Sequence, residues 1–298
     1  MGVQETLQDI NTLNNTFDDL NDELRIILES KEIEVGDNYT LNQMKDLLNS
    51  PDILFVKSEF KLRLFYCDTD ADKIFELNPD TLDSIKSVNS IGQYLYGIGG
   101  GWNTLKLRLY HTDDSTDKIY ELNPNTLQAI NTAATISTGP FGIGGGWDGD
   151  KLRIYHCGNG YELHELNPDT LKPINTITTL GQQAMGVGGG WDGSKLRIYI
   201  TNLGANKIHE LNVDTLATIN TVNVNTGPTG IGGDWDGIRL RLYYTGAKAG
   251  AKNIYEVDVD TLQPIHTVDA RSMFPRGIGG GYEVISHARY NSEVIYLP

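Results

Sequence analysis

The sequence predicts an all-β fold, a six-bladed β-propeller with five blades as the alternative, behind an N-terminal α-helical coiled-coil stalk. Three observations lead to this prediction. A unit of about 44 residues recurs from residue 53 onward, as in propellers and other repeat folds. Each unit reads as four short strands, and a heptad pattern occupies the start of the chain. The predicted domains are a stalk over 1–31, a linker with a short helix over 32–52, and a propeller of repeats over 53–298.

The stalk prediction rests on apolar side chains spaced alternately by four and three residues. Such spacing places them on one face of a helix, where a second helix can cover them. Asn14 and Asn21 lie on the same face of the predicted helix. Polar residues at such positions weaken helix association but fix its register and the number of helices. A single amphipathic helix packed on the next domain is the alternative. The residues expected to join copies of the chain are Val3, Leu7, Ile10, Asn14, Phe17, Asn21, Leu24 and Leu28.

The sequence predicts a break in the linker, followed by a short second helix. Gly36, Asp37 and Asn38 break the helical pattern. A short second helix is expected from Thr40, which can cap it, to Leu48, just before Pro51.

Each repeat begins with a glycine-rich strand and continues through three further strands. The second strand reads Lys-Leu-Arg-Leu-Tyr and alternates with period two, the third reads Lys-Ile-Tyr-Glu-Leu, and the fourth follows Asp-Thr-Leu. Asp148-Gly149 is a two-residue hairpin signal, and Asn167-Pro168-Asp169 is a turn with its bend preset by proline. Pro173 falls in a fourth strand, which should therefore lie at a sheet edge.

The glycine triplets have a steric explanation in a propeller. The first strand of every blade lies next to the central axis, where the blades converge and side chains must be small. Gly144-Gly145-Gly146 fits that need, and so do the equivalent triplets. A dinucleotide-binding loop is the competing interpretation, but no helix follows the motif and it recurs in every unit.

The number of blades follows from counting first strands. Five glycine-rich strands begin near Gly97, Gly142, Gly186, Gly230 and Gly277, and the segment Ile53 to Val56 can supply one more. This count gives six blades, the last of which lacks its own fourth strand. The segment Glu32 to Val35 could fill that edge and close the ring. Five blades remain the alternative.

Composition excludes several classes of partner. The formal net charge is −15, which disfavours binding to nucleic acid and to anionic lipid. No apolar run is long enough to span a bilayer. Cys67 and Cys157 occupy the same place in two repeats, too far apart for a disulfide, and read as small, half-buried core residues. His111, His156 and His287 also share one position but belong to different blades, so we expect no metal site and no cofactor.

Repeated side chains supply the candidate binding residues. In every unit an arginine such as Arg108 recurs with a glutamate such as Glu121, which predicts a cross-strand ion pair in each blade. One aromatic position beside a hairpin recurs as well. Its rings can pack between blades or stack on sugars, and the sequence leaves both roles open. No nucleophile elbow, P-loop or isolated carboxylate pair is present, so no catalytic residue is expected. The candidate ligand-binding residues are Trp102, Trp147, Trp191, Trp235 and Tyr282.

The repeats resemble the glycine-rich propeller repeats of bacteriophage tail and tail-fibre proteins. The matching motifs are Tyr155-His156-Cys157 and Asp117-Lys118-Ile119-Tyr120-Glu121-Leu122. The resemblance covers about four fifths of the chain and is a repeat signature without active-site residues. A weaker resemblance is to tachylectin-like five-bladed propeller lectins, which carry a Gly-Gly-Trp element in each blade. The "KLRLY" and "ELNPDTL" strands depart from that family, so none of its sugar-binding residues is carried over.

The resemblance to phage proteins implies a function and a location. It implies an extracellular virion protein of a tail fibre or other appendage, whose coiled coil forms a homotrimer and contacts other virion proteins. Its propeller is then expected to bind a glycan of the bacterial surface, without enzymatic activity. A purely structural virion component, such as a baseplate, connector or head-decoration protein, is the alternative. A third hypothesis is a propeller enzyme acting on polysaccharide, which would need one blade to depart from the others.

Overall fold

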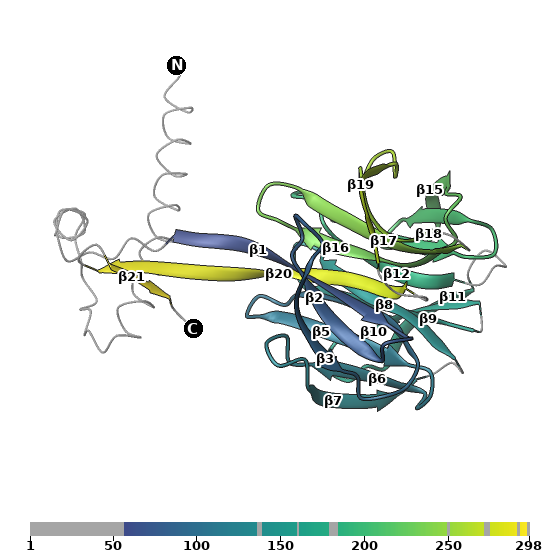
Figure 1. The fold of residues 1–298 in the computed structure, drawn as a ribbon, viewed down its shortest axis with the longest axis horizontal. Coiled ribbons are helices and arrows are strands. Elements are labelled where there is room, and N and C mark those ends of the chain that lie inside the picture. The colour runs from purple at the N-terminus through teal and green to yellow at the C-terminus, as the bar shows by residue number, and fades with distance from the viewer. Residues whose placement is uncertain are drawn as a thin grey trace, which may run out of the picture. The chain divides into compact units, whose positions relative to one another are not determined.

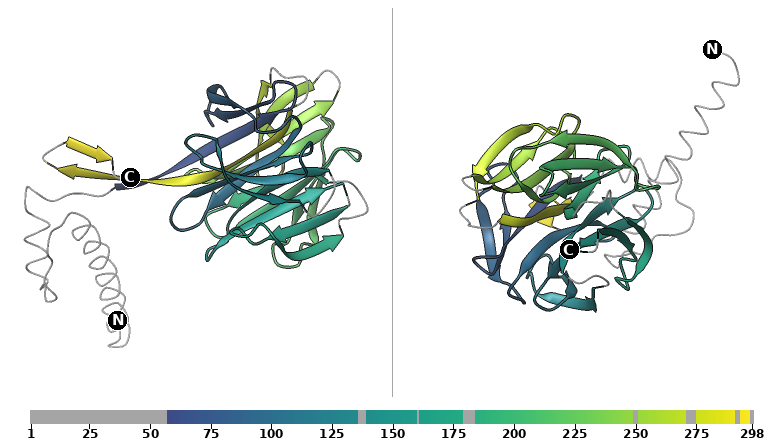
Figure 2. Two further views of the ribbon diagram at one scale, coloured as in Figure 1. Left: turned by 90° about the horizontal axis from the view of Figure 1, so that it is seen from below. Right: turned by 90° about the vertical axis from the view of Figure 1, so that its right-hand side faces the viewer.

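The computed structural model describes residues 57–135, 139–159, 161–178, 184–248, 251–270, 275–290 and 293–296. All regular elements of these residues are β-strands, which form five sheets (Figure 1). The sheets follow one another around a central axis, as the right-hand view of Figure 2 shows. An all-β propeller is therefore confirmed. No helix in the described part of the chain is long and apolar enough to cross a membrane.

Four blades are each built from four consecutive antiparallel strands, with the first strand innermost. Their outermost strands carry Pro173 and Pro264, so the prediction of an edge strand is confirmed. Blade 2 contains β4 (Leu95–Trp102), β5 (Leu107–Asp113), β6 (Lys118–Leu122) and β7 (Ala129–Ala134). Blade 3 contains β8 (Pro140–Trp147), β9 (Leu152–Gly158), β10 (Glu162–Leu166) and β11 (Pro173–Thr178). Blades 4 and 5 contain β12 (Ala184–Trp191), β13 (Leu196–Asn202), β14 (Lys207–Leu211), β15 (Thr218–Asn223), β16 (Pro228–Trp235), β17 (Leu240–Lys248), β18 (Ala251–Val257) and β19 (Pro264–Asp269).

Blade 1 joins the two ends of the described chain. Its strands are β20 (Pro275–Tyr290), β1 (Lys57–Asp68), β2 (Lys73–Leu77) and β3 (Ser84–Asn89). The last glycine-rich strand, β20, therefore pairs with β1 and begins no sixth blade. The prediction of six blades is wrong for this reason, and the five-bladed alternative is correct. The ring closes through strands from opposite ends of the sequence.

Two units make up the chain, and the propeller is the one that spans Ser58–Ser286. The other contains Met1–Lys57 and His287–Leu297. Its described part includes a hairpin between the end of β20 and β21 (Glu293–Tyr296), with Arg289 paired to Val294. The predicted coiled coil over 1–31, its seam residues and the predicted linker over 32–52 lie outside the described residues. They remain predictions.

The glycine triplets line the axis, as the sequence predicts. A methyl group in place of a hydrogen at Gly188 would lie 2.3 Å from the Ile231 carbonyl oxygen of the next blade. At Gly145 it would lie 1.8 Å from the Arg153 carbonyl oxygen of its own blade. The space enclosed by the triplets has no room for a water molecule. The axis is thus packed backbone against backbone, and it is no channel.

Candidate functional site

The repeated arginine of the second strand pairs with a glutamate of the third strand in the same blade. In blade 2, Arg108 Nε donates to Glu121 Oε1 at 2.8 Å and Nη2 donates to Oε2 at 2.9 Å. Such bidentate pairs fix geometry as well as adding energy. The predicted cross-strand ion pairs are confirmed. The other four are Arg63–Glu76, Arg153–Glu165, Arg197–Glu210 and Arg241–Glu256.

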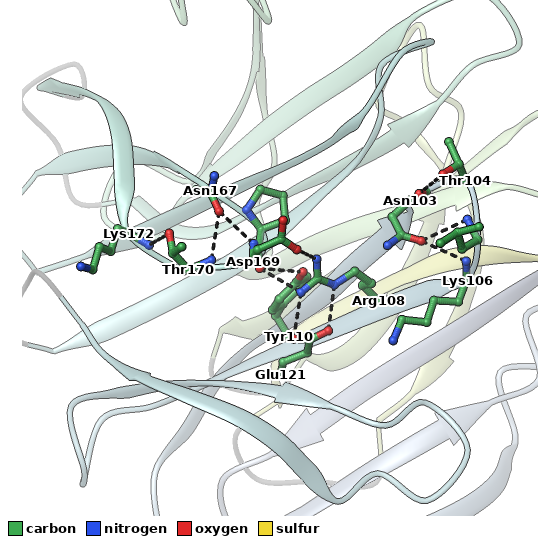
Figure 3. A network of polar contacts seen from close by, with 12 residues as sticks. Asn103, Thr104, Lys106, Arg108, Tyr110, Glu121, Asn167, Asp169, Thr170 and Lys172 are labelled. Carbon is green, nitrogen blue, oxygen red and sulfur yellow. Dashed lines mark hydrogen bonds and ion pairs between the residues drawn. The ribbon is translucent and has the colours of Figure 1, made fainter.

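Each of these arginines also bonds the next blade, which the sequence analysis missed. Arg108 Nη2 donates to the Pro168 carbonyl at 3.0 Å, and Nη1 bonds the Asp169 carboxylate (Figure 3). The turn between the third and fourth strands of one blade is thereby held by the arginine of the blade before it. The sequence contains a signal for this link, because the arginine and the Asp-Thr-Leu turn recur at fixed positions within the repeat. The same link occurs at all five junctions, with turn residues Asn125, Asp169, Asp214, Asp260 and Asp80.

The four recurrent tryptophans end the innermost strands of blades 2 to 5, and Tyr282 holds the equivalent position within β20. A methyl group at Gly193 would lie 2.9 Å from the Trp235 ring, so this ring covers the hairpin of the preceding blade. Trp102 stacks on Tyr282 with ring centroids 5.6 Å apart, and Tyr282 also meets Phe60 edge-on at 5.6 Å. Tyr282 is only 6% exposed, whereas the four tryptophans are half-buried. Packing between blades is therefore one role of this position, and sugar binding by these rings stays a prediction.

A pocket opens between blades 3 and 4. It has a volume of about 260 Å³ and is lined by the first hairpin of blade 3 and by the second, third and fourth strands of blade 4. Asp148, Lys195 and Asp214 supply polar groups, while Leu196 and Ile219 supply apolar surface. The turn between β8 and β9 and the turn between β14 and β15 both contribute to the pocket. Both lie at the end of the blades where the tryptophans lie. We call this side the tryptophan face.

The same pocket recurs between blades 4 and 5. Its volume is about 280 Å³, and Asp192, Arg239, Asp260 and Ile265 occupy the places of Asp148, Lys195, Asp214 and Ile219. We call these two cavities the inter-blade pockets. Sequence reasoning did not find them, because each combines residues of two blades.

Hydrogen bonds hold the turns that line the first inter-blade pocket. Asp148 Oδ1 accepts bonds from the Asp150 and Lys151 amides at 2.9 and 2.8 Å. Asn212 Oδ1 accepts bonds from the Asp214 and Thr215 amides at 3.0 and 2.9 Å. Side chains that bond their own turn in this way restrict its conformation. The polar groups of the pocket are therefore largely preorganised.

Asp234 breaks the symmetry of the axis and was also missed. It stands where the other blades have a third glycine, and it is fully buried. Its Oδ1 accepts bonds from the Trp191 and Trp235 amides at 3.0 and 2.9 Å, and Oδ2 accepts one from the Tyr282 amide at 3.3 Å. The carboxyl group thereby links blades 4, 5 and 1. Burial raises the pKa of Asp234 to about 7, although the three amides act in the opposite direction.

The raised pKa of Asp234 predicts a pH dependence of stability. An unfolded aspartate has a pKa of about 3.9, so the folded protein binds more protons between about pH 4 and 7. The contribution of Asp234 to the free energy of unfolding is fully present below about pH 4, and it is lost as the pH rises through about 7. We expect Asp234→Asn, which cannot ionise, to gain on the order of 3 kcal/mol relative to wild type between pH 5 and pH 8. Thermal unfolding at both pH values measures this, with the exposed Asp150→Asn as the control. Parallel wild-type and Asp234→Asn curves would contradict the assignment.

The repeated histidines are structural. His111 and His156 are fully buried, and one ring nitrogen of each lies 3.1 and 3.0 Å from the Gly97 and Gly142 carbonyl oxygens. Burial lowers the pKa of both to about 4, so each is neutral at physiological pH. The side chain of His287 lies outside the described part. Among the residues that the structure describes, no three His, Cys, Asp or Glu side chains are arranged to hold a metal ion.

Both cysteines are core residues, as predicted, and both are fully buried and not the half-buried residues that the sequence predicts. Cys67 Sγ accepts a hydrogen bond from the Gly277 amide at 3.2 Å, which ties β1 to the closing strand β20. Burial raises the pKa of Cys67 and of Cys157 to about 12, so neither is a reactive thiolate.

Comparisons with known proteins give no family. No family model matches the chain, and no curated protein matches it. Solved structures that resemble it include a Bacteroides caccae protein of unknown function, with 11% identity, a TM-score of 0.42, and coverage of 70% of this chain and 73% of that one. A nidogen/laminin complex has 13% identity, a TM-score of 0.49, and coverage of 74% and 98%. Myxococcus xanthus glutaminyl cyclase has 12% identity, a TM-score of 0.48, and coverage of 84% and 100%. Similarity at this level carries no argument about function.

Proposed function

We propose that this chain is a trimeric fibre or tail protein of a bacteriophage particle, and that its propeller binds a glycan of the bacterial cell surface. The observation that carries the binding role is the recurrence of the inter-blade pocket at two successive junctions. A site that is repeated by the blades suits a ligand that is itself repeated, as the sugars of a cell-surface polysaccharide are. The resemblance of the repeats to phage tail proteins supports the virion location.

The size and lining of the pockets suit a saccharide unit. Volumes of about 260 and 280 Å³ fall just below the range of about 300–1,000 Å³ that is typical of sites for drug-sized ligands. A sugar ring offers C–H groups on its faces and hydroxyl groups around its edge. Ile219, which is 58% exposed, can pack against the former, and Asp148, Lys195 and Asp214 can bond the latter. Binding of this kind needs no cofactor and no catalytic residue.

Repetition makes weak sites effective. When several pockets of one rigid ring engage one polysaccharide, the later contacts are intramolecular and the avidity exceeds the affinity of one pocket. A trimer built on the predicted coiled coil would multiply this effect. The proposed partners are therefore other copies of this chain, neighbouring virion proteins and a surface glycan.

A glycan array probed with the full-length chain tests the proposal. We expect binding to a bacterial polysaccharide, and we expect Lys195→Gln with Ile219→Ser to weaken its avidity about tenfold by removing one site. Both residues are exposed on blade 4, so the fold should persist. Lys207→Gln is the control, because Lys207 lies in the same blade at the opposite end of the paired strands.

Two results would contradict the binding role. One is the absence of any saccharide ligand for the assembled full-length protein, which favours the purely structural virion component. The other is equal avidity of the Lys195/Ile219 variant and the Lys207 control.

A further inference from the structure

We infer that the inter-blade pockets select neutral, hydroxyl-rich saccharides and exclude acidic ones. This inference rests on the proposed function and adds the chemical class of the ligand. It follows from which polar groups of the pockets are already bonded within the protein and which remain exposed.

Most N–H groups of the arginines that line the pockets already donate hydrogen bonds within the protein. In the second pocket, Arg197 Nε and Nη2 donate to Glu210 at 2.8 and 3.1 Å, Nη2 also donates to the Val259 carbonyl at 3.1 Å, and Nη1 donates to Asp260 at 2.8 Å. Four of the five N–H groups of this guanidinium are thus used. Arginine commonly recognises a ligand carboxylate through two parallel N–H bonds. Arg197 cannot supply them, and Arg153 has the same set of bonds in the first pocket.

The exposed groups are mainly hydrogen-bond acceptors. Asp214 bonds Arg153 through Oδ1, yet 89% of its side chain is exposed. The equivalent Asp260 bonds Arg197 through Oδ1 and is 80% exposed. An ionised carboxylate only accepts hydrogen bonds, so it suits the hydroxyl groups of a neutral sugar. It repels a carboxylate, sulfate or phosphate on the ligand, in keeping with the net charge of −15.

Most cations that line the pockets are already paired with carboxylates of the protein. Lys195 is the exposed cation of the first pocket. In the second pocket the corresponding residue, Arg239, lies 3.4 Å from Glu256 and is partly neutralised by it. Asp258 lines that pocket where the first pocket has Asn212. We therefore expect the second pocket to exclude anions more strongly than the first.

The junction between blades 1 and 2 shows that an asparagine can take the place of the aspartate in the turn, with the Glu283 carboxylate 3.8 Å from Arg63 Nη1. Asn125 takes the place of the aspartate there, and Arg63 Nη1 donates to its Oδ1 at 2.8 Å. Arg63 Nη2 still donates to the Pro124 carbonyl at 2.9 Å. An asparagine thus preserves the link between blades while removing one negative charge. The equivalent substitutions at Asp214 and Asp260 should therefore change the ligand site without unfolding the ring.

Paired sugars and paired variants test the inference. The full-length chain is assayed against oligosaccharides of glucose and galactose and against the corresponding oligosaccharides of glucuronic and galacturonic acid. We expect wild type to bind a neutral member at least tenfold more tightly than its uronic-acid partner. We expect Asp214→Asn with Asp260→Asn to weaken neutral binding about tenfold while unfolding at the wild-type temperature. Asp70→Asn is the control, because Asp70 is exposed on the turn between β1 and β2, away from both pockets.

The outcomes separate the inference from the proposed function. Saccharide binding that is equal or tighter for the uronic acid overturns the inference alone. Neutral binding that is unchanged in the Asp214/Asp260 variant overturns it as well. Wild-type protein that binds no saccharide refutes the proposed function, and the inference falls with it.

Discussion

Gly145→Ala should abolish folding of the propeller. The added methyl group would lie 1.8 Å from the Arg153 carbonyl oxygen, which belongs to the paired strand β9. Neither backbone can move away, because β8 is packed against the neighbouring blades and β9 is held by β10. Gly100, Gly189 and Gly233 have the same 1.8 Å contact in their blades. We expect a loss above about 4 kcal/mol, comparable with the whole stability of an ordinary domain.

Circular dichroism and urea unfolding of the purified variant check this expectation. Gly204→Ala is the matched control, since the nearest atom to its added methyl group is 3.8 Å away, an ordinary contact. We expect the control to unfold cooperatively with nearly wild-type stability. A Gly145→Ala protein that unfolds cooperatively within about 1 kcal/mol of wild type would show that the axis is not closely packed.

Arg241→Ala should have the second-largest effect, because it removes the link between blade 5 and the turn between β2 and β3 of blade 1. Arg241 Nη2 donates to the Pro79 carbonyl at 2.8 Å and to Glu256 at 2.9 Å, and Nη1 bonds Asp80. Removing it leaves Glu256, which is 4% exposed, without its main counter-charge. Breaking a buried pair by removing one partner costs about 3–5 kcal/mol.

Two further variants separate loss of the pair from loss of the buried charge. Arg241→Leu combined with Glu256→Leu removes both charges, so we expect it to recover part of the lost stability. Arg239→Ala removes a 59%-exposed arginine that lies 3.4 Å from the same glutamate, and should cost less than about 1 kcal/mol. Urea midpoints of the three proteins give the comparison. Equal midpoints for Arg241→Ala and Arg239→Ala would refute a stabilising link by Arg241 between blades 5 and 1.

Much of the fold could be predicted because it depends on local pattern. Alternating residues around Arg108 predict a strand, which the structure buries along its whole length, and Pro173 favours an edge strand. Repetition strengthened both signals, since the strand of Arg108 recurs in every blade and a second fourth strand begins with Pro264. The Arg108–Glu121 pair was predictable for the same reason.

The candidate site could not be predicted to the same extent. The inter-blade pocket contains Asp148 of one blade and Asp214 of the next, so its geometry depends on how blades pack. Asp234 was visible in the sequence as a departure from the glycine triplet. Its place between the amides of Trp191 and Tyr282 appears only when three blades meet at the axis.

The sequence alone determined that this chain forms a propeller of four-stranded units with glycine at its axis. Those features arise from the period of the side chains and from the size of a hydrogen atom. Only the tertiary structure decided that the blades number five, because β20 pairs with β1 across most of the chain length. The same glycine motif can begin a new blade or complete the first one. The choice depends on which unpaired strand edge it meets, and the need to satisfy the backbone hydrogen bonds of β1 settles it.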